Sequence, residues 1–235
     1  WIKEIRDVTD KELFAVGEYW SGDVTKLHRY ITETEGEISL FDVPLHYNLY
    51  NASKDFNYDL SKILDKTLVK ENPAKAVTFV DNHDTQPGQS LQSYIDVWFK
   101  QIAYSIVLLR NSGYPCVFYG DVYGIKHDNI EPVKDIETLI YLRKEKLYGE
   151  QHDYFDNHNC IGWTLEGDNE HLSSGLAVIM TNGNYAEKKM FIGKNHVGEK
   201  FIDALGNNQE EVIIDSEGFG VFKVNPKSVS TWVSA

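Results

Sequence analysis

The stretch Ala76-Val77-Thr78-Phe79-Val80-Asp81-Asn82-His83-Asp84 decides the fold, because a mostly apolar run stops abruptly at a group of polar residues. A short run without polar alternation is typical of a strand that is buried on both faces, as in a parallel sheet. A long segment with apolar residues at spacings of three and four follows at 90–111. A strand followed by such a helix predicts one β-α unit of a parallel sheet.

Three more β-α units are predicted on the same grounds. Their strands are expected at 13–17, 38–43 and 115–119, and their helices at 23–33, 57–67 and 132–147. The sequence therefore predicts a parallel α/β layer over residues 1–149. A (β/α)₈ barrel needs about 250 residues, so four units correspond to half of such a barrel.

From residue 150 onward the pattern changes from helical periodicity to alternation, and the turn residues Gly, Asn and Asp become regularly spaced. Strands are expected at 160–165, 174–181, 187–192, 199–203, 210–215, 219–224 and 228–234. This predicts a second, all-β domain over 150–235, an antiparallel sandwich with Greek-key connections. No Pro-rich linker separates the two parts, which indicates that they pack closely.

Composition narrows the class of partner. The 235 residues include 23 Lys plus Arg and 36 Asp plus Glu, giving a formal net charge of -13. This charge repels the phosphates of nucleic acids and anionic membrane surfaces, but it leaves neutral ligands unaffected. A neutral polysaccharide fits this field, whereas nucleic acid and membrane are not expected as partners.

The ends and the cysteines of the chain say little about its location. Cys116 and Cys160 are too few for a disulfide framework, although one bridge is compatible with the sequence. The first residues, Trp1-Ile2-Lys3-Glu4-Ile5, carry no signal-peptide pattern and resemble the middle of a helix. We therefore expect an N-terminal portion to be missing, and the sequence leaves secreted and cytoplasmic locations equally open.

Two acidic residues stand at predicted strand ends. Glu18 follows the apolar run 13–16, and Asp84 follows the run 76–80. Two carboxyl groups flanking a bond are the usual device for glycoside hydrolysis, and sugar rings stack on aromatic side chains such as Trp20. These positions are candidates for a carbohydrate-cleaving site.

Each candidate also has a purely structural interpretation. Glu18 can be an exposed loop acid that caps the following helix. The segment 81–85 can form side-chain turns, in which Asp81 and Asn82 hold the loop. A single aromatic residue such as Trp20 is more often part of a core. The residues alone do not decide between these interpretations.

Four motifs carry a resemblance to a known family. They are Gly17-Glu18-Tyr19-Trp20, Phe41-Asp42-Val43-Pro44-Leu45-His46-Tyr47, the segment Phe79 to Gln89, and Ser112-Gly113-Tyr114-Pro115-Cys116-Val117-Phe118-Tyr119-Gly120-Asp121. Together, in this order and followed by a β-sandwich, they resemble the alpha-amylase family of retaining glycoside hydrolases, and within it the bacterial liquefying enzymes. The resemblance spans essentially the whole chain.

The resemblance implies a (β/α)₈ barrel in which Glu18 follows the fifth strand and Asp84 the seventh. It implies that Glu18 is the general acid and base, and that Asp84 stabilises the oxocarbenium-like transition state. It further implies substrate contacts from His83, Trp20, Asn82 and Gln89, with Trp20 on the leaving-group side.

The resemblance also shows what the sequence lacks. The nucleophile of the family lies after the fourth strand in a Gly-Phe-Arg-x-Asp motif, which does not occur in these 235 residues. The chain is thus expected to be the C-terminal half of the enzyme, with the missing N-terminal half as its partner. By itself this piece is expected to be inactive.

Calcium is the cofactor that the resemblance implies. The main structural site is expected in the missing half. A second ion, between the barrel and the β-sandwich, would take backbone carbonyls from Phe56, Tyr58 and His152 and the carboxylate of Asp153, with Asn182 at the position of another carboxylate. An amide oxygen can bind calcium, but the loss of one carboxylate weakens the site. Asp153 can alternatively cap a loop.

Three functions of different classes follow. The favoured one is endo-hydrolysis of α-1,4-glucosidic bonds in starch or maltodextrin by a retaining double displacement. The alternatives are a related α-glucan transglycosylase and a catalytically incomplete carbohydrate-binding fragment. In all three the partner is an α-glucan polysaccharide or oligosaccharide.

Overall fold

The computed structural model describes residues 2–11 and 13–235. Its first part contains four strands, β1 (Val16–Gly17), β2 (Ser39–Phe41), β3 (Ala76–Phe79) and β4 (Tyr114–Cys116), which form one sheet in the order β1-β2-β3-β4. All three strand pairs are parallel. Sequential order with parallel pairing is the arrangement of a (β/α)₈ barrel, so the predicted partial barrel is confirmed.

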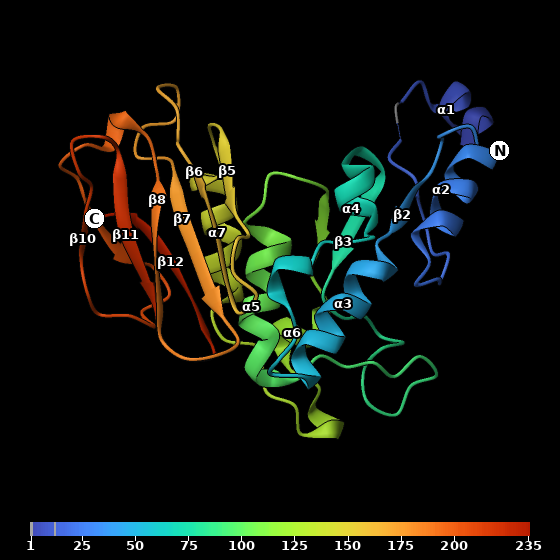
Figure 1. The fold of residues 1–235 in the computed structure, drawn as a ribbon. Helices are drawn as coiled ribbons and strands as arrows, with labels where there is room; N and C mark the ends of the chain where they lie inside the picture. Colours follow the sequence, from blue (N-terminus) through green and yellow to red (C-terminus); the bar gives the residue numbers. More distant parts are fainter. Residues whose placement is uncertain (1, 12) are drawn as a thin grey trace.

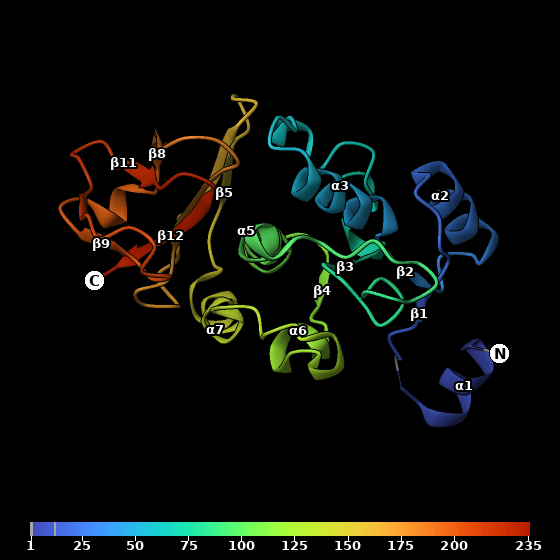
Figure 2. The same ribbon diagram turned by 90° about the horizontal axis from the view of Figure 1, so that it is seen from below.

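One helix precedes the parallel sheet, and at least one helix follows each of its strands. The helices are α1 (Ile2–Thr9), α2 (Val24–Glu33), α3 (Val43–Lys54), α4 (Leu68–Glu71), α5 (Val97–Leu108), α6 (Tyr119–Tyr123) and α7 (Ile136–Lys146). The helices α2, α3 and α5 lie along one side of the parallel sheet, as the view in Figure 2 shows. Short 3₁₀ turns lie at Leu60–Lys62, Pro73–Lys75, Lys126–Asp128 and Lys194–His196. No helix among the described residues is long and apolar enough to cross a membrane.

One helix is misplaced in the prediction. A helix was expected at 57–67, but α3 begins immediately after β2, and only a 3₁₀ turn occupies Leu60–Lys62. The cause is the capping of α3, because the Asp42 carboxylate accepts a hydrogen bond from the Leu45 N–H at 3.1 Å and Pro44 lies in the first turn. An acidic cap followed by proline is a helix-start signal that outweighs the apolar spacing further along.

The second part is an antiparallel β domain. Its strands are β5 (Gln151–Tyr154), β6 (Cys160–Leu165), β7 (Leu176–Thr181), β8 (Ala186–Phe191), β9 (Lys200–Asp203), β10 (Val212–Ile213), β11 (Phe219–Val224) and β12 (Ser228–Ser234). Six form a sheet in the order β10-β9-β12-β7-β6-β5, and β8 pairs with β11. The sequence did not predict β5, whose four residues form no apolar run.

The two sheets of the β domain share an apolar core, as a sandwich requires. Its buried residues come from both sheets and the connection after β10: Cys160, Ala177, Ile179, Met190, Ile192, Phe201, Val212, Ile214, Phe222, Val224 and Trp232. Among these, Trp232 is the largest, and its ring centroid lies 6.2 Å from that of Phe222. Cys116 and Cys160 are both free thiols, so the chain has no disulfide between them.

The two parts pack closely, as expected. Figure 1 shows α5 and α7 between the parallel sheet and the β domain. The main hydrophobic core passes from α5 and α7 into β6, β7 and β12 without interruption. Within it, the buried indole N–H of Trp163 donates to the Leu109 carbonyl at 2.7 Å. The domain boundary between 149 and 150 remains our proposal, and it falls in the connection between α7 and β5.

Candidate active site

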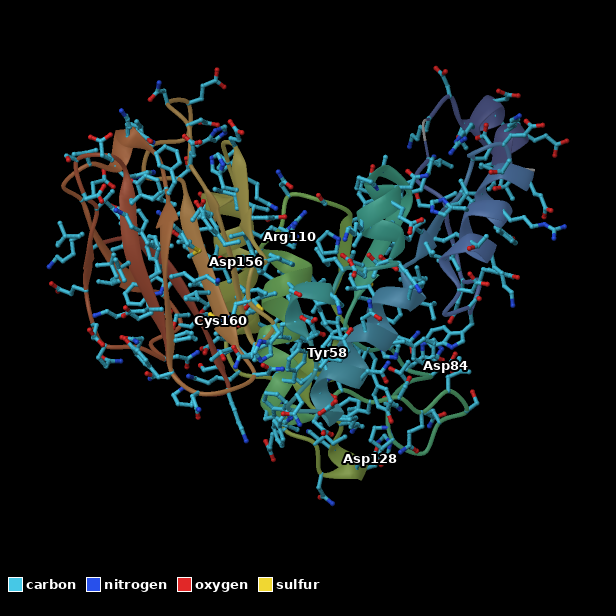
Figure 3. The ribbon with its side chains drawn as sticks, viewed as in Figure 1. Tyr58, Asp84, Arg110, Asp128, Asp156 and Cys160 are labelled. Carbon is cyan, nitrogen blue, oxygen red and sulfur yellow. The ribbon has the colours of Figure 1, made fainter. Side chains whose placement is uncertain are left out.

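Acidic residues follow all four parallel strands. Glu18 comes directly after β1, Asp42 after β2, Asp81 and Asp84 after β3, and Asp121 lies in α6 beyond β4. Because the carboxyl ends of parallel strands meet at one edge of the sheet, these residues share that edge. Glu18 and Asp84 are thus two strands apart on the same edge, and Figure 3 labels Asp84 at this end of the α/β part.

Glu18 is exposed, and its carboxylate forms no hydrogen bond or ion pair with any other described residue. It does not cap the following helix. Asp23 has that role, because its side chain accepts a hydrogen bond from the Thr25 N–H at 3.0 Å. The next residue, Tyr19, stacks on Tyr30 at a centroid distance of 5.0 Å. The structural interpretation of Glu18 as a cap therefore has no support in the geometry.

Trp20 is half-buried, and it is held from two sides. Its indole N–H donates to the Tyr47 hydroxyl at 3.0 Å, and its ring lies 6.1 Å from that of Phe79 and 5.8 Å from that of His46. This packing fixes the orientation of the indole. The exposed part of the ring remains the candidate stacking surface.

The loop after β3 is a hydrogen-bonded turn. The Asn82 side-chain oxygen accepts the N–H groups of Asp84 at 3.0 Å and of Thr85 at 2.9 Å. The Thr85 hydroxyl donates to the Asp81 carboxylate at 2.7 Å. Asp81 and Asn82 thus hold the loop, as the sequence suggested. His83 is exposed, with its Nε2 atom 3.6 Å from the Asp84 carboxylate, and Gln89 is also exposed.

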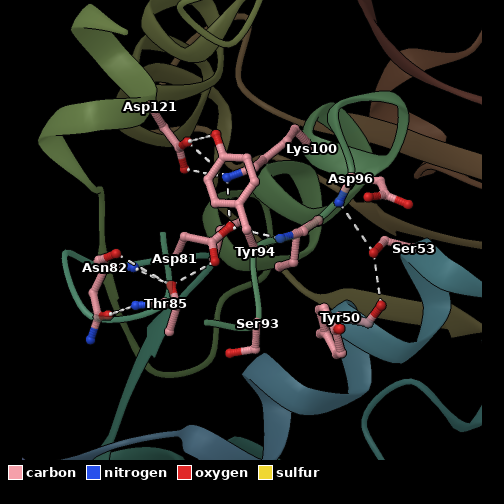
Figure 4. A network of polar contacts seen from close by, with 12 residues as sticks. Tyr50, Ser53, Asp81, Asn82, Thr85, Ser93, Tyr94, Asp96, Lys100 and Asp121 are labelled. Atoms are coloured by element: carbon pink, nitrogen blue, oxygen red, sulfur yellow. Dashed lines mark hydrogen bonds and ion pairs between the residues drawn. The ribbon is translucent and has the colours of Figure 1, made fainter. Parts of the chain in front are cut away.

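A buried lysine lies beneath this loop (Figure 4). Lys100 of α5 is 1% exposed, and its ammonium group donates to the Asp81 carboxylate at 2.6 Å and to both oxygens of Asp121 at 2.7 and 2.9 Å. The Tyr104 hydroxyl donates to the same Asp121 at 2.6 Å. Burial, reinforced by that carboxylate, raises the pKa of Tyr104, so the phenol keeps the proton that it donates.

This network joins two strand ends. Asp81 follows β3 and Asp121 follows β4, so a single cation fixes the loops that follow neighbouring strands. Burial raises the pKa of Asp81 to about 6, and the charge of Lys100 opposes that rise. Lys100 was not predicted from the sequence. Its signal is a lysine directly after the apolar residues Val97-Trp98-Phe99, in the helix that follows a strand end with two aspartates.

His46 supports the same edge from α3. It is fully buried, with Nδ1 2.7 Å from the Val80 carbonyl and Nε2 2.7 Å from the Ser93 hydroxyl. Since a carbonyl can only accept, Nδ1 carries the proton. Burial lowers the pKa of His46 to about 4, so the ring is neutral and structural. It is stacked on Phe79 with ring centroids 5.2 Å apart.

The residues expected to bind calcium are not brought together. Asp153 forms a bidentate ion pair with Arg110, at 2.9 and 2.7 Å. It lies opposite Trp163 in β6, which lies opposite Val178 in β7, and Asn182 is four residues beyond Val178. These four residues alone separate Asp153 from Asn182 by about 13 Å along the strand direction. Two ligand atoms of one calcium ion lie within about 5 Å of each other.

The other expected calcium ligands also fall into two separate groups, one near Asn182 and one near Asp153. Asn182 and Tyr58 are neighbours, because the Asn182 amide donates to the Tyr58 carbonyl at 2.8 Å, and Phe56 precedes Tyr58 on its loop. His152 is on β5 with Asp153, and its Nε2 atom lies 2.5 Å from a Glu166 carboxylate oxygen. Among the described residues, Glu150, His152 and Glu166 form a group of potential metal ligands within 4.8 Å of one another; the His152–Glu166 contact and the backbone bond from the Glu166 N–H to the Glu150 carbonyl bring them together.

Comparison with known proteins identifies the family. Residues 1–194 match the family model described as Alpha amylase, catalytic domain, and residues 176–233 match Alpha-amylase C-terminal. The chain is 52% identical over 235 residues to an alpha-amylase of Geobacillus stearothermophilus and 49% identical over 238 residues to one of Bacillus licheniformis. These alignments cover 99% of this chain but 43% and 46% of the relatives, so the chain spans less than half of their length.

Solved structures agree at the level of the fold. An alpha-amylase from Geobacillus thermoleovorans, complexed with acarbose, superimposes with a TM-score of 0.66 at 16% identity over 100% of this chain and 56% of that one. A gamma-CGTase from Alkalophilic bacillus clarkii gives 0.68 at 18% identity over 99% of this chain and 37% of that one. With both family models matched in order along a partial barrel and a β-sandwich, the chain belongs to the alpha-amylase family.

Proposed function

We propose that this chain contributes to the endo-hydrolysis of α-1,4-glucosidic bonds in starch or maltodextrin, with retention of configuration. Glu18 is the general acid that protonates the glycosidic oxygen and the base that then deprotonates water. Asp84 stabilises the positive charge that develops on the sugar ring.

One observation carries the proposal. Glu18 and Asp84 follow β1 and β3 at one edge of a parallel sheet, in a chain about half of whose residues are identical to those of the alpha-amylases it resembles. Glu18 has no polar partner among the described residues, so its carboxyl group is free to contact a substrate. Asp84 is two-thirds buried at its side chain and sits on a loop that its neighbours hold rigid.

Other residues are assigned to substrate binding. His83 and Gln89 are exposed in the segment that carries Asp84, and they have the donors and acceptors that sugar hydroxyls require. Trp20 offers a sugar-stacking ring next to Glu18. The side-chain oxygen of Asn82 already accepts two hydrogen bonds within the loop, so its amide N–H₂ group is the part left to bind a substrate.

The nucleophile is not among these 235 residues, since the Gly-Phe-Arg-x-Asp motif does not occur in them. We therefore assign two of the three carboxylates of the reaction to this chain. In the proposed mechanism the covalent glycosyl intermediate forms on a carboxylate outside this sequence.

The test is Glu18→Gln in the full-length protein that carries this chain. Turnover of maltoheptaose should fall by several orders of magnitude, while calorimetric binding of the oligosaccharide stays within a few fold. The matched control is Glu170→Gln, an exposed position in the β domain, which should leave both unchanged. Near-normal turnover of Glu18→Gln would remove Glu18 from the acid role.

The products of the same assay separate the two catalytic alternatives. Shorter maltooligosaccharides alone indicate hydrolysis, whereas products longer than maltoheptaose or cyclic products indicate glucan transfer. A protein that binds maltoheptaose without converting it would support the binding-only alternative.

A further inference from the structure

The loop between α3 and α4 is attached to the β domain by hydrogen bonds between neutral groups. The carbonyl of Tyr58 accepts the side-chain amide of Asn182 at 2.8 Å. Two residues along, the N–H of Leu60 donates to the carbonyl of His158 at 2.6 Å. Both backbone groups therefore face the β domain.

The first residue of this segment is held differently. The ammonium group of Lys227, in the turn between β11 and β12, lies 3.6 Å from the centroid of the Phe56 ring. This is a cation–π contact between the loop and the β domain. Residues 56, 58 and 60 thus each make one contact with the β domain, and we call these contacts together the 56–60 joint.

Asn182 is the central residue of the joint. It has no exposed surface, and its amide nitrogen donates to the Tyr58 carbonyl, which can only accept a hydrogen bond. The side-chain oxygen then points elsewhere, and it has no partner among the described residues. A carboxylate at this position would place a charged oxygen against the Tyr58 carbonyl.

The groups of the 56–60 joint do not suit a hard cation such as calcium. Calcium takes six to eight oxygen ligands, usually with several carboxylates. Here the carbonyls of Tyr58 and His158 are already hydrogen-bonded, and that of Asn159 accepts the Thr181 hydroxyl at 2.7 Å. The side chains beside these carbonyls are those of Asn159 and Asn182, which are neutral amides, whereas a calcium site would need carboxylates. The nearest aspartate in sequence, Asp59, instead caps the turn at Ser61.

The second asparagine is also packed in place. The amide nitrogen of Asn159 lies 3.1 Å from the point that a Cβ atom on Gly183 would occupy, so a larger residue at 183 would press against it. The Gly183 N–H donates to the Thr181 hydroxyl at 3.0 Å, which closes the turn after β7. This side of the joint is held by hydrogen bonds within the β domain.

We propose that the 56–60 joint is a metal-independent attachment between the barrel and the β domain, in which the Asn182 amide proton occupies the place of a bridging cation. The resemblance implies calcium between these two parts, and the residues present do not suit it. The joint therefore holds equally well with and without divalent cations. This inference does not depend on the catalytic roles proposed above.

The first test needs no substitution. In the full-length protein, hydrogen exchange of a peptide covering 57–62 is compared with that of a peptide covering β7, in excess EGTA and in excess CaCl₂. The protection of the Leu60 amide relative to β7 should be the same in both. Relative protection that falls in EGTA, or rises in CaCl₂, would overturn the proposal.

The second test changes the donor. Asn182→Asp replaces the amide with a carboxylate, so in EGTA the Leu60 amide should exchange about tenfold faster relative to β7, as expected for one lost hydrogen bond. Asn184→Asp adds the same charge at an exposed position two residues away and should match the unmodified protein. If Asn182→Asp also matches it in EGTA, the Asn182 amide does not hold the joint, and the proposal fails.

Discussion

The two ends of the candidate site are built differently. At β3 and β4, Asp81, Lys100 and Asp121 form a buried ionic network, and Asn82 and Thr85 hold the Asp84 loop above it. At β1, Glu18 is exposed and has no polar partner among the described residues. The loop that carries Asp84 is thus held by hydrogen bonds within this chain, whereas Glu18 makes no polar contact with the described residues.

This difference suggests separate tasks for the two residues. A group that stabilises charge has to be fixed in advance, because reorganisation during the reaction reduces its effect. A general acid has to exchange its proton with both substrate and water, so a carboxylate tied up by internal partners would be a poor one. The predictions below test this contrast, from the largest expected effect to the smallest.

Lys100→Met should cause the largest loss of stability. It removes the cation that lies between the buried carboxylates of Asp81 and Asp121, and breaking a buried pair in this way costs about 3–5 kcal/mol. Urea unfolding would measure the change in free energy. Lys144→Met removes an exposed lysine and should cost almost nothing. Equal midpoints for the two variants would mean that the network does not stabilise the strand ends.

His46 should make stability depend on pH. Burial lowers the pKa of His46 from 6.5 to about 4. Between pH 4 and 6.5, this histidine therefore binds a proton in the unfolded chain but not in the folded chain. The stabilisation is complete above pH 6.5 and is lost as the pH falls to 4, by about 3 kcal/mol in total. His46→Gln should lack this part of the profile, whereas His158→Gln, at an exposed position, should retain it.

The comparison between variants is necessary because Asp81 acts in the opposite direction. Burial raises its pKa to about 6, so the folded chain gains stability as the pH falls from 6 to 4. The contribution of His46 is the difference between the unmodified protein and His46→Gln at each pH. A constant difference from pH 4 to 7 would contradict the assignment.

Thr85→Val should have a smaller effect. Valine keeps the shape but removes the hydroxyl that donates to Asp81 and accepts the Asn82 N–H at 2.9 Å. Thr85 is fully buried, so stability should fall by about 2 kcal/mol. Turnover should fall with it, because Asp84 is carried by this turn. Thr85→Ser keeps both bonds and should retain most of the activity; a full loss in Thr85→Ser would mean that the methyl group, not the hydroxyl, holds the loop.

Much of the fold was predictable, because strands buried on both faces leave uninterrupted apolar runs in the sequence. The β3 strand is such a run, and it was found nearly to the residue. The helix α3 was missed because a cap and a proline decide its start, whereas the prediction followed apolar spacing. The β5 strand is polar and forms by pairing with β6, which only the tertiary structure reveals.

The site was less predictable, because side chains from distant segments decide it. Glu18 and Asp84 could be placed at strand ends from local sequence, but the partner of Asp81 is 19 residues away on a helix. The expected calcium ligands failed for the same reason. His152 and Asp153 were assigned by sequence position, and the pairing of β5 with β6 carries them away from Asn182. Such register is fixed by the whole sheet and cannot be inferred from a short motif.

Glu18→Gln should have the smallest effect on folding. An exposed carboxylate without a partner contributes little, so the free energy of unfolding should change by less than about 0.5 kcal/mol. Urea unfolding of the same variant used for the turnover assay would measure it. A variant that has lost turnover but not stability has lost a chemical function, as proposed for a general acid. A loss of more than about 1 kcal/mol would instead make Glu18 a structural residue, and the contrast between the two strand ends would disappear.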